Sequence, residues 1–360
     1  MEPMKKFWRK NGGGCSFLKL WTKSKLTKQP VVTACPEYTS MERHTLRILR
    51  CMPDVTTIGV HGIGGIGKTS VLKTVIDFPP IKLLFDVVIW VSVSRNWSTR
   101  KIQDQVLRQL SLSTSQDSET NHEIAMRLFD ALQSQRFLLL LDDVWEHISL
   151  DLIGIPQPAM ENGCKMILST RSRDVCRIMA ADRMVQMERL LPEEAWELFQ
   201  EQLGWIIDSG SKMWHYARTI VKKCHGLPLL IIVTGRALAK ENDAFAWRLA
   251  LKEFSHRNGI YKKLQFSFDR LESLELKSCF LYCAIFPEDR ELRIIELVDL
   301  WIKEGLVAGN NLTDSRKKGC DIVDILVDAS LLQILEGGVS IKMHDLIRDF
   351  VSIWLDRQVD

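Results

Sequence analysis

The first half of the chain alternates short apolar runs with stretches that have the 3.6-residue period of an amphipathic helix. The apolar runs are rich in β-branched and aliphatic residues, which predicts buried strands over 55–60, 85–93, 136–144 and 164–171. The periodic stretches between them predict helices over 69–78, 98–110 and 123–134. Strands that alternate with helices indicate a doubly wound parallel sheet with right-handed crossovers. We therefore expect an α/β domain over residues 36–187.

After about residue 188 the strand pattern gives way to helical periodicity. The predicted helices are 191–203, 213–226 and 226–239. Pro228 falls near the start of the third helix, where proline is tolerated. From about residue 256 the chain has further short helices and one strand-like piece over 338–343. We therefore expect a helical domain over 188–255 and a small, mainly helical domain over 256–360.

The last helix of the chain has a clear apolar stripe. Its members, which recur at helical spacing, are Met343, Leu346, Ile347, Phe350, Val351 and Trp354. Four polar residues fall outside the stripe: His344, Asp345, Arg348 and Asp349. His344 and Asp345 lie where the strand-like piece gives way to the helix, and Asp is favoured at such a start. The local pattern alone therefore assigns His344 to a helix cap.

The net charge of +3 conceals an uneven distribution of charge. Residues 1–30 contain eight Lys/Arg and one acidic residue, whereas the remaining 330 residues contain 40 basic and 44 acidic residues. The body of the chain therefore lacks the charge of a specific nucleic-acid binder. We expect the basic arm over 1–35 to be a disordered, solvated tail. Its interleaved Trp8, Phe17 and Trp21 leave contact with an anionic membrane as the alternative.

Several features favour a cytoplasmic protein. The longest apolar runs, such as 137–141, are too short to span a bilayer. The N-terminus has no apolar signal segment, and Glu2 occupies the position where N-myristoylation needs glycine. Nine scattered cysteines indicate reduced thiols. The closest pair, Cys279 and Cys283, lacks the additional ligands of a zinc site, so we favour a buried helical face over a metal site.

The segment "GIGGIGKT" (62–69) fits the phosphate-binding pattern G-x-x-x-x-G-K-[ST] between a predicted strand and a predicted helix. Its glycines allow a tight turn that points backbone N–H groups at phosphate oxygens, and the helix start adds its positive dipole end. Lys68 would reach the β- and γ-phosphates, and the Thr69 hydroxyl would bind Mg²⁺. The predicted nucleotide-binding residues here are Gly62, Gly64, Gly65, Ile66, Gly67, Lys68, Thr69 and Ser70.

A buried strand that ends in two carboxylates supplies the acidic partner of this loop. In "FLLLLDDVW", Asp142 would hold Mg²⁺ together with Thr69, and Asp143 would orient or deprotonate an attacking water, which makes it the candidate catalytic residue. The next strand ends at Arg171. Carboxyl ends of parallel strands line the ligand crevice, so Arg171 is either a sensor of the γ-phosphate or a solvated loop residue.

Seven motifs occur along the chain in a characteristic order: "GIGGIGKTS", "FDVVIWVSVS", "FLLLLDDVW", "ILSTRS", "CHGLPLL", "CFLYCAIFPED" and "MHD". Together they resemble the NB-ARC nucleotide-binding module of plant intracellular disease-resistance receptors, over about residues 36–355. Trp145 and the form of 279–289 resemble the coiled-coil subclass. The resemblance implies a P-loop NTPase domain, a helical domain and a winged-helix domain folded over one nucleotide.

The resemblance also implies roles for individual residues. Arg171 would contact the γ-phosphate, Pro228 would pack against the adenine, and His344 would contact the β-phosphate of ADP. Asp345 would help to hold the winged-helix domain in place. The implied cycle is a switch that is off with ADP and on with ATP, with Mg²⁺ as the metal and slow hydrolysis as the reset. The implied partners are a second copy or a related receptor.

The chain departs from the receptors that it resembles in its length. Only about 50 residues precede the first strand, and no leucine-rich repeats follow, so we expect a truncated form. Two alternatives to the switch stay open. One is a P-loop ATPase that turns over steadily, whereas the switch would be at most a slow ATPase. The other is a non-signalling adaptor or decoy that pairs with full-length receptors.

Overall fold

The computed structural model describes residues 39–113, 119–287, 290–335 and 337–359. The basic arm over residues 1–35 lies outside them. The described residues group into two units: residues 39–63 with 67–188 form the first, and residues 64–66 with 189–359 form the second. The four-part division expected from the sequence stays a prediction.

The first unit contains a five-stranded sheet in which every pairing is parallel. The strands are β1 (Thr57–His61), β2 (Val87–Ser92), β3 (Phe137–Val144), β4 (Lys165–Thr170) and β5 (Arg183–Gln186). Their order in the sheet is β2-β3-β4-β1-β5, which confirms the predicted doubly wound architecture. Residues 137–142 of β3 are all buried, which explains why the sequence of this strand is apolar without interruption as far as Asp142.

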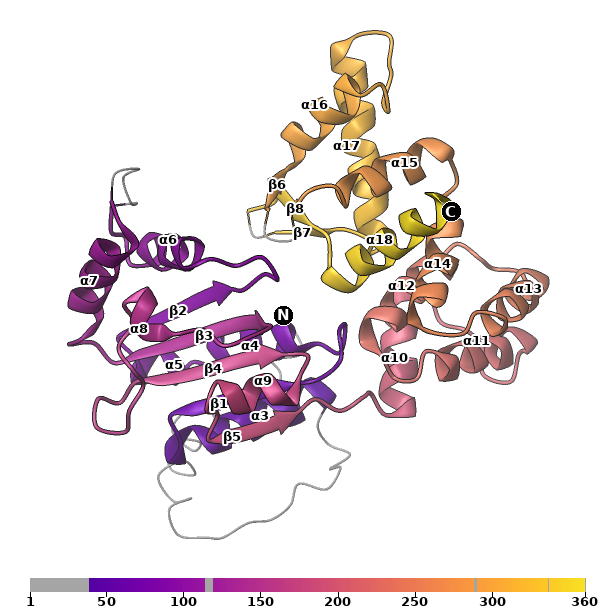
Figure 1. Ribbon diagram of the computed structural model, residues 1–360. Coiled ribbons are helices and arrows are strands. Elements are labelled where there is room, and N and C mark those ends of the chain that lie inside the picture. The colour runs from indigo at the N-terminus through magenta and orange to yellow at the C-terminus, as the bar shows by residue number, and fades with distance from the viewer. Residues whose placement is uncertain (1–38, 114–118, 288–289, 336, 360) are drawn as a thin grey trace. The chain divides into compact units, whose positions relative to one another are not determined.

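Helices cover both faces of this sheet (Figure 1). They are α3 (Ser40–Cys51), η2 (Met52–Asp54), α4 (Lys68–Ile76), α5 (Ile81–Leu84), α6 (Thr99–Gln109), α7 (Asn121–Leu132), α8 (Leu150–Ile153) and α9 (Arg173–Ile178). Side chains of α6 to α9 form one core with β2, β3 and β4, in which Val106 and Leu128 join Leu139. Right-handed crossovers place α4, which follows the interior strand β1, on the opposite face.

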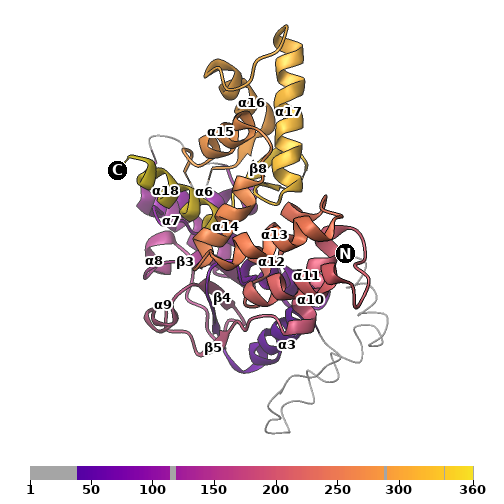
Figure 2. The ribbon, with the colours of Figure 1, turned by 90° about the vertical axis from the view of Figure 1, so that its right-hand side faces the viewer.

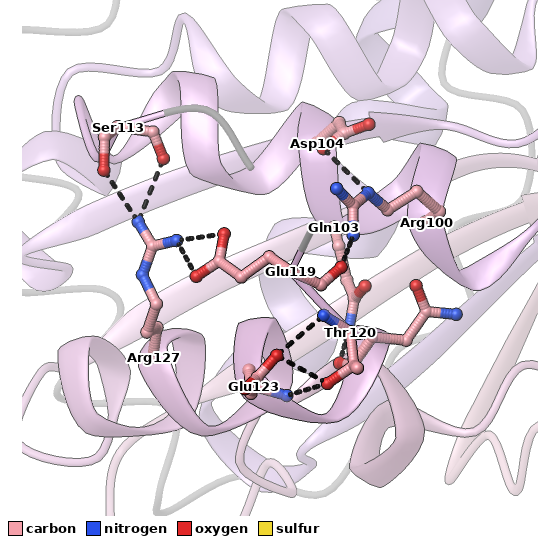
Figure 3. A network of polar contacts seen from close by, with 9 residues as sticks. Arg100, Gln103, Asp104, Ser113, Glu119, Thr120, Glu123 and Arg127 are labelled. Carbon is pink, nitrogen blue, oxygen red and sulfur yellow. Dashed lines mark hydrogen bonds and ion pairs between the residues drawn. The ribbon is translucent and has the colours of Figure 1, made fainter. Parts of the chain in front are cut away.

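A polar network joins residues of α6 and Ser113 to the start of α7 (Figure 3). Arg127 Nη1 donates to both carboxylate oxygens of Glu119, at 2.6 and 2.8 Å, and its Nη2 donates to the Ser113 carbonyl at 3.0 Å. Arg100 Nη1 donates to the Glu119 carbonyl at 2.6 Å. The fully buried Gln103 donates from Nε2 to the Asn121 carbonyl at 2.8 Å. These bonds tie the start of α7 to α6 and so support the sheet face that both helices cover.

Helix α3 holds the last residue of the first unit. The buried His44 ring accepts a hydrogen bond at Nε2 from the Glu188 N–H at 2.9 Å, while its Nδ1 bonds the Ser40 carbonyl at 2.7 Å. Burial lowers the pKa of His44, which keeps the ring neutral and Nε2 available as an acceptor. Arg47 Nη1 also pairs with the Glu188 carboxylate at 2.8 Å. These contacts hold both the backbone and the side chain of Glu188, the last residue of the first unit, against α3.

The second unit is mainly helical. Its helices are α10 (Pro192–Leu203), α11 (Lys212–Lys223), α12 (Pro228–Leu238), α13 (Ala244–Ser255), α14 (Ile260–Asp269), α15 (Leu274–Cys283), α16 (Ile294–Lys303), α17 (Leu312–Asp328) and α18 (Asp345–Val359). Its strands β6 (Leu292–Arg293), β7 (Gln333–Ile334) and β8 (Ser340–Lys342) form an antiparallel sheet in the order β6-β8-β7. Helices α16 and α17 pack side by side in both views (Figures 1 and 2). Within the described ranges, no helix combines the length and apolar character needed to cross a membrane.

Aromatic side chains dominate the core of the second unit. Phe199 and Trp247 meet edge to face with ring centroids 6.2 Å apart. Phe268 contacts the rings of Phe280 at 5.6 Å and Phe350 at 5.9 Å, which joins α14, α15 and α18. Such buried aromatic pairs contribute roughly 0.5–1.5 kcal/mol each beyond the burial of their area. The consecutive helices α14 and α15 thus share one apolar centre with α18, which is distant in sequence.

The pair Cys279 and Cys283 lies on this buried face of α15, as the helical interpretation predicted. Cys283 Sγ donates to the Cys279 carbonyl at 3.3 Å, which is a bond within one helical turn. Burial raises the pKa of the Cys279 thiol to about 12. It also raises the pKa of Cys283. Both thiols therefore stay protonated and behave as small apolar side chains.

Helix α18 confirms the predicted apolar stripe, since Leu346, Ile347 and Phe350 are buried, as is Met343 just before the helix. Arg348 was predicted outside that stripe, and the structure adds that the residue is nevertheless buried, with 7% exposed. Its Nη1 donates to the carbonyls of Ala284, at 3.1 Å, and Phe286. These carbonyls follow the end of α15, where backbone acceptors lack helical partners, and the long arginine side chain reaches them.

Candidate functional site

The glycine-rich loop leaves the sheet at the carboxyl end of β1. The Gly62 N–H donates to the Thr170 carbonyl at 3.2 Å, so the loop begins beside the end of β4. Gly65 and Gly67 adopt φ angles of +73° and +98°, which side chains with a Cβ rarely adopt. Gly67 precedes α4, and no side chain caps the start of this helix. The first N–H groups of α4 are therefore suited to an anionic ligand.

Lys68 begins α4, and its side chain turns back over the loop. The residue is only 7% exposed, and Nζ donates to the carbonyls of Gly62 at 2.8 Å and Ile63 at 3.2 Å. A buried ammonium group held by backbone carbonyls places a positive charge beside the helix start. Lys68 and the α4 terminus thus combine in one anion-binding arrangement.

Thr69 and Asp142, the predicted Mg²⁺ ligands, are in contact. The Thr69 hydroxyl donates to the Asp142 carboxylate at 2.9 Å, and Asp142 is 8% exposed. The Ser169 hydroxyl donates to the same carboxylate at 2.6 Å. Sequence reasoning missed Ser169, although a buried strand that changes from apolar residues to Ser169 and Thr170 at its end was a usable signal. Buried carboxylates need such donors, so Ser169 supports the position of Asp142.

An irregularity in strand β3 gives Asp142 and Asp143 different backbone conformations. The pairing of β3 with β4 shifts between Leu141 and Val144, and Asp143 adopts a left-handed φ of +58°. Asp tolerates this conformation better than most residues. The Asp143 N–H donates to Ser169 Oγ at 2.8 Å. Bulges commonly redirect side chains beside active sites, and here one hydroxyl joins both aspartates.

Arg171 is largely buried, while its role as a sensor of the γ-phosphate stays a prediction. Its Nε lies 3.7 Å from Asp143 Oδ1, and the two side chains are 20% and 19% exposed. The guanidinium carbon also lies 4.6 Å from the centre of the Trp145 ring. The register explains this proximity: Val144 and Thr170 are partners, so the next residue of each strand leaves the same edge of the sheet.

His61 ends β1 immediately before the loop. Its pKa lies below the ordinary value, first because of burial and then because of the positive charge of Arg173. The imidazole is therefore neutral near pH 7. The positive charge at the start of the loop comes from Lys68, with no contribution from this histidine.

Pro228 and His344 both lie in the second unit. Pro228 is the first residue of α12. His344 directly precedes α18, and its Nδ1 accepts a hydrogen bond from the Leu346 N–H at 3.0 Å. The cap predicted from the local pattern is therefore present, and it assigns the ring proton to Nε2. The predicted contacts of Pro228 with adenine and of His344 with phosphate stay predictions.

Ser169→Ala tests the link between the aspartates. The variant removes a donor to Asp142 and the acceptor of the Asp143 N–H, and we expect it to lower the free energy of unfolding by about 1–3 kcal/mol. Ser169→Cys, with a weaker donor of similar size, should fall between wild type and alanine. Urea denaturation of the three proteins measures this order. Equal stability of wild type and Ser169→Ala would contradict the proposed bridging role.

Comparison with known proteins agrees with this geometry. Residues 38–205 match the NB-ARC domain, and residues 285–351 match the Disease resistance protein Winged helix domain. The chain therefore carries an NB-ARC domain, followed by a disease-resistance winged-helix domain. The first match contains the loop, both aspartates and Arg171, and the second contains the antiparallel sheet and His344. Nucleotide binding through the P-loop is therefore a property of the module that this NB-ARC chain carries.

Curated relatives are plant disease resistance proteins. A probable disease resistance protein of Arabidopsis thaliana is 39% identical over 314 residues, which are 84% of this chain and 37% of that protein. Disease resistance protein RPS5 of the same plant is 39% identical over 323 residues, 85% of this chain and 36% of that protein. The NB-ARC chain thus spans little more than a third of the length of these relatives.

Solved structures include a Signal Transduction ATPase with Numerous Domains protein, with a tetratricopeptide repeat sensor, from Pyrococcus horikoshii. It matches 90% of this chain and 43% of its own length, with a TM-score of 0.54 and 17% identity. This likeness concerns the fold. It agrees with the predicted P-loop NTPase sheet, and the winged-helix match confirms the predicted winged-helix domain.

Proposed function

We propose that this NB-ARC chain is an ADP/ATP-binding switch, off with ADP and on with ATP, that slow hydrolysis resets. The observation that carries the proposal is the set of contacts at the carboxyl edge of the sheet. Thr69 meets Asp142 at 2.9 Å, and Arg171 meets Asp143 at 3.7 Å, beside a loop with Lys68 buried over it. Such a site has separate groups for the β-phosphate, a metal ion and the γ-phosphate.

The donor set at Thr69 and Asp142 fits Mg²⁺. This ion prefers hard oxygen ligands, commonly one or two from the protein together with phosphate oxygens and water. The Thr69 hydroxyl and the Asp142 carboxylate supply such oxygens on adjacent elements. When bound, the ion would neutralise phosphate charge. Ser169 would keep the Asp142 carboxylate oriented toward it.

The environment of Asp143 supports slow hydrolysis. The carboxylate lies 3.7 Å from the Arg171 guanidinium, and its backbone N–H is held by Ser169. A carboxylate engaged with a cation has to exchange partners before it accepts a proton from water. We infer that Asp143 becomes the catalytic base only when Arg171 turns to the γ-phosphate. Hydrolysis would then require the triphosphate to be bound first.

The first turn of α18 is the proposed latch of the off state. Nδ1 of His344 accepts from the Leu346 N–H, so Nε2–H is the donor that would contact the β-phosphate of ADP. Asp345 begins the helix, where a carboxylate is stabilised by the helix dipole. Arg348 attaches this turn to the carbonyls that follow α15. The latch is therefore a rigid piece of the second unit.

The nucleotide that copurifies with the chain tests the proposal. We expect denaturation of the purified protein to release about one ADP per chain, because the off state should retain ADP. A site that instead hydrolyses ATP steadily, at about 1 s⁻¹ or faster, would contradict the switch and favour a turnover ATPase. Chromatography of the released nucleotide and a phosphate-release assay separate these outcomes.

Asp345→Val is expected to speed the release of ADP. The loss of a carboxylate from the first turn of α18 removes roughly 0.3–1 kcal/mol of interaction with the helix dipole, or about 2- to 5-fold in rate. Asp356→Val, which changes an exposed residue of the same helix, is the matched control. Chase of a fluorescent ADP analogue measures both off-rates. Identical rates in the two variants would exclude Asp345 from the latch.

A further inference from the structure

Two guanidinium groups meet one indole ring at the carboxyl edge of the sheet. The guanidinium carbon of Arg95 lies 4.3 Å from the centre of the Trp145 ring, and that of Arg171 lies 4.6 Å from it. The three residues follow neighbouring strands, since Arg95 comes after β2, Trp145 after β3 and Arg171 after β4. The cluster therefore lies along the same sheet edge as Asp142 and Asp143.

The indole is held through its ring and not through its polar atom. Among the residues that the structure describes, Trp145 Nε1 is buried and has no hydrogen-bond acceptor. A buried indole N–H usually has a partner, and leaving it without one is unfavourable. The stacking of two cations on the ring compensates in part, because the negative face of the ring attracts each of them.

The stacking brings two like charges to one place. Arg95 and Arg171 repel each other, and the nearby Asp143 carboxylate, 3.7 Å from Arg171, offsets one positive charge. Together the three groups carry one net positive charge at the edge that also bears the phosphate-binding loop. An additional anion there would be attracted by both arginines. A terminal phosphate matches this requirement in charge and in its number of acceptor oxygens.

We propose that Trp145 is a positioning residue that aligns Arg171 and Arg95 toward the γ-phosphate and so sets the preference for ATP over ADP. This inference rests on the switch proposed above. The ring faces the Arg171 guanidinium at 4.6 Å, and Asp143 Oδ1 lies 3.7 Å from its Nε, so the ring contributes to setting the plane and the direction of the guanidinium. Arg95 adds a second cation from β2. The third phosphate of ATP would bring the additional anionic oxygens that these two cations attract.

The test compares Trp145→Leu with Trp145→Phe in the full chain after removal of bound nucleotide. Leucine keeps apolar volume but has no π face, whereas phenylalanine keeps a weaker one. We expect Trp145→Leu to weaken ATP binding by roughly 3- to 30-fold, the range that a cation–π contact supports, and to leave ADP binding within about twofold. Trp145→Phe should show a smaller loss. Isothermal titration with ATP and ADP gives both affinities.

A neighbouring indole provides the matched control. Trp97 donates from Nε1 to Glu146 at 2.9 Å, and no arginine stacks on its ring in the described part of the chain. Trp97→Leu should leave the ratio of ATP to ADP affinity unchanged. Arg95→Ala should weaken ATP binding selectively, as Trp145→Leu does. Circular dichroism will show whether Trp145→Leu folds. If it does not fold, Arg95→Ala still tests the inference.

A double-mutant comparison separates positioning from a general structural role. In an Arg171→Ala background, Trp145→Leu should cause little further loss of ATP affinity, because its partner is already absent. Equal weakening of ADP and ATP by Trp145→Leu, or full additivity with Arg171→Ala, would overturn the inference. If Arg171→Ala alone weakens ATP binding while Trp145→Leu and Arg95→Ala do not, only this inference fails. If the wild-type chain binds neither ATP nor ADP, both this inference and the proposed switch function are contradicted.

Discussion

Lys68→Ala is expected to weaken ADP binding by roughly 10- to 100-fold, the effect of losing a charge-assisted contact worth about 1.5–3 kcal/mol. The side chain is buried over the loop, with Nζ 2.8 Å from the Gly62 carbonyl, so its ammonium is already directed into the anion-binding arrangement. The chain should therefore purify largely without nucleotide. Quantifying nucleotide released on denaturation, followed by titration with ADP, measures the effect.

Lys73→Ala is the matched control for that experiment. Lys73 belongs to the same helix α4 and is exposed, so its removal changes the net charge equally but leaves the loop intact. We expect its nucleotide content to equal that of wild type. Full occupancy of the Lys68→Ala protein, or equal losses in both variants, would show that the glycine-rich loop is not the binding site.

Arg348→Ala is expected to lower the free energy of unfolding of the second unit by about 3 kcal/mol, because truncating one partner of a buried, charged hydrogen bond costs roughly 2–5 kcal/mol. The variant removes the donor to the Ala284 and Phe286 carbonyls, which helix α15 leaves without helical partners. Amide exchange in α18 should accelerate, since its first turn loses this attachment. Urea denaturation and hydrogen exchange of α18 peptides measure both effects.

The control for this prediction lies nine residues further along the same helix. Arg357 is exposed, so Arg357→Ala should change stability by less than about 0.5 kcal/mol. Arg348→Lys keeps the charge with a different donor geometry and should recover part of the loss. If Arg348→Ala is as stable as Arg357→Ala and its α18 amides exchange at the wild-type rate, the arginine does not anchor the latch.

Most of the elements that the sequence failed to predict are short and partly exposed, although the 12-residue helix α13 was missed as well. Strand β5 has four residues and pairs with β1 alone among the described strands, so its buried set is too small to produce an alternating pattern. Helix α9 has six residues, and β6 and β7 have two each. Periodicity needs several turns or several alternations to be recognised. Longer elements such as β3 and α7 were predicted because they provide them.

The residues of the candidate site also divide into those that a local sequence motif predicts and those that it does not. Lys68, Thr69, Asp142 and Asp143 were predicted because each belongs to a local motif whose chemistry requires its residue type. Ser169, Arg95 and the buried position of Arg348 were not found. Each acts on a residue from another element: Ser169 on Asp142 at 2.6 Å, and Arg348 on the carbonyls after α15. A local pattern contains no information about such partners.

The sequence by itself determined the alternation of strands and helices, the glycine-rich loop with its lysine, and the acidic end of a buried strand. These depend on residues close together in the chain, where hydrophobic period and backbone freedom act directly. Only the tertiary structure decided that Val144 pairs with Thr170, and hence that Trp145 meets Arg171. Strand order and register arise from the packing of the whole sheet, because that packing selects among many pairings that the local patterns permit equally.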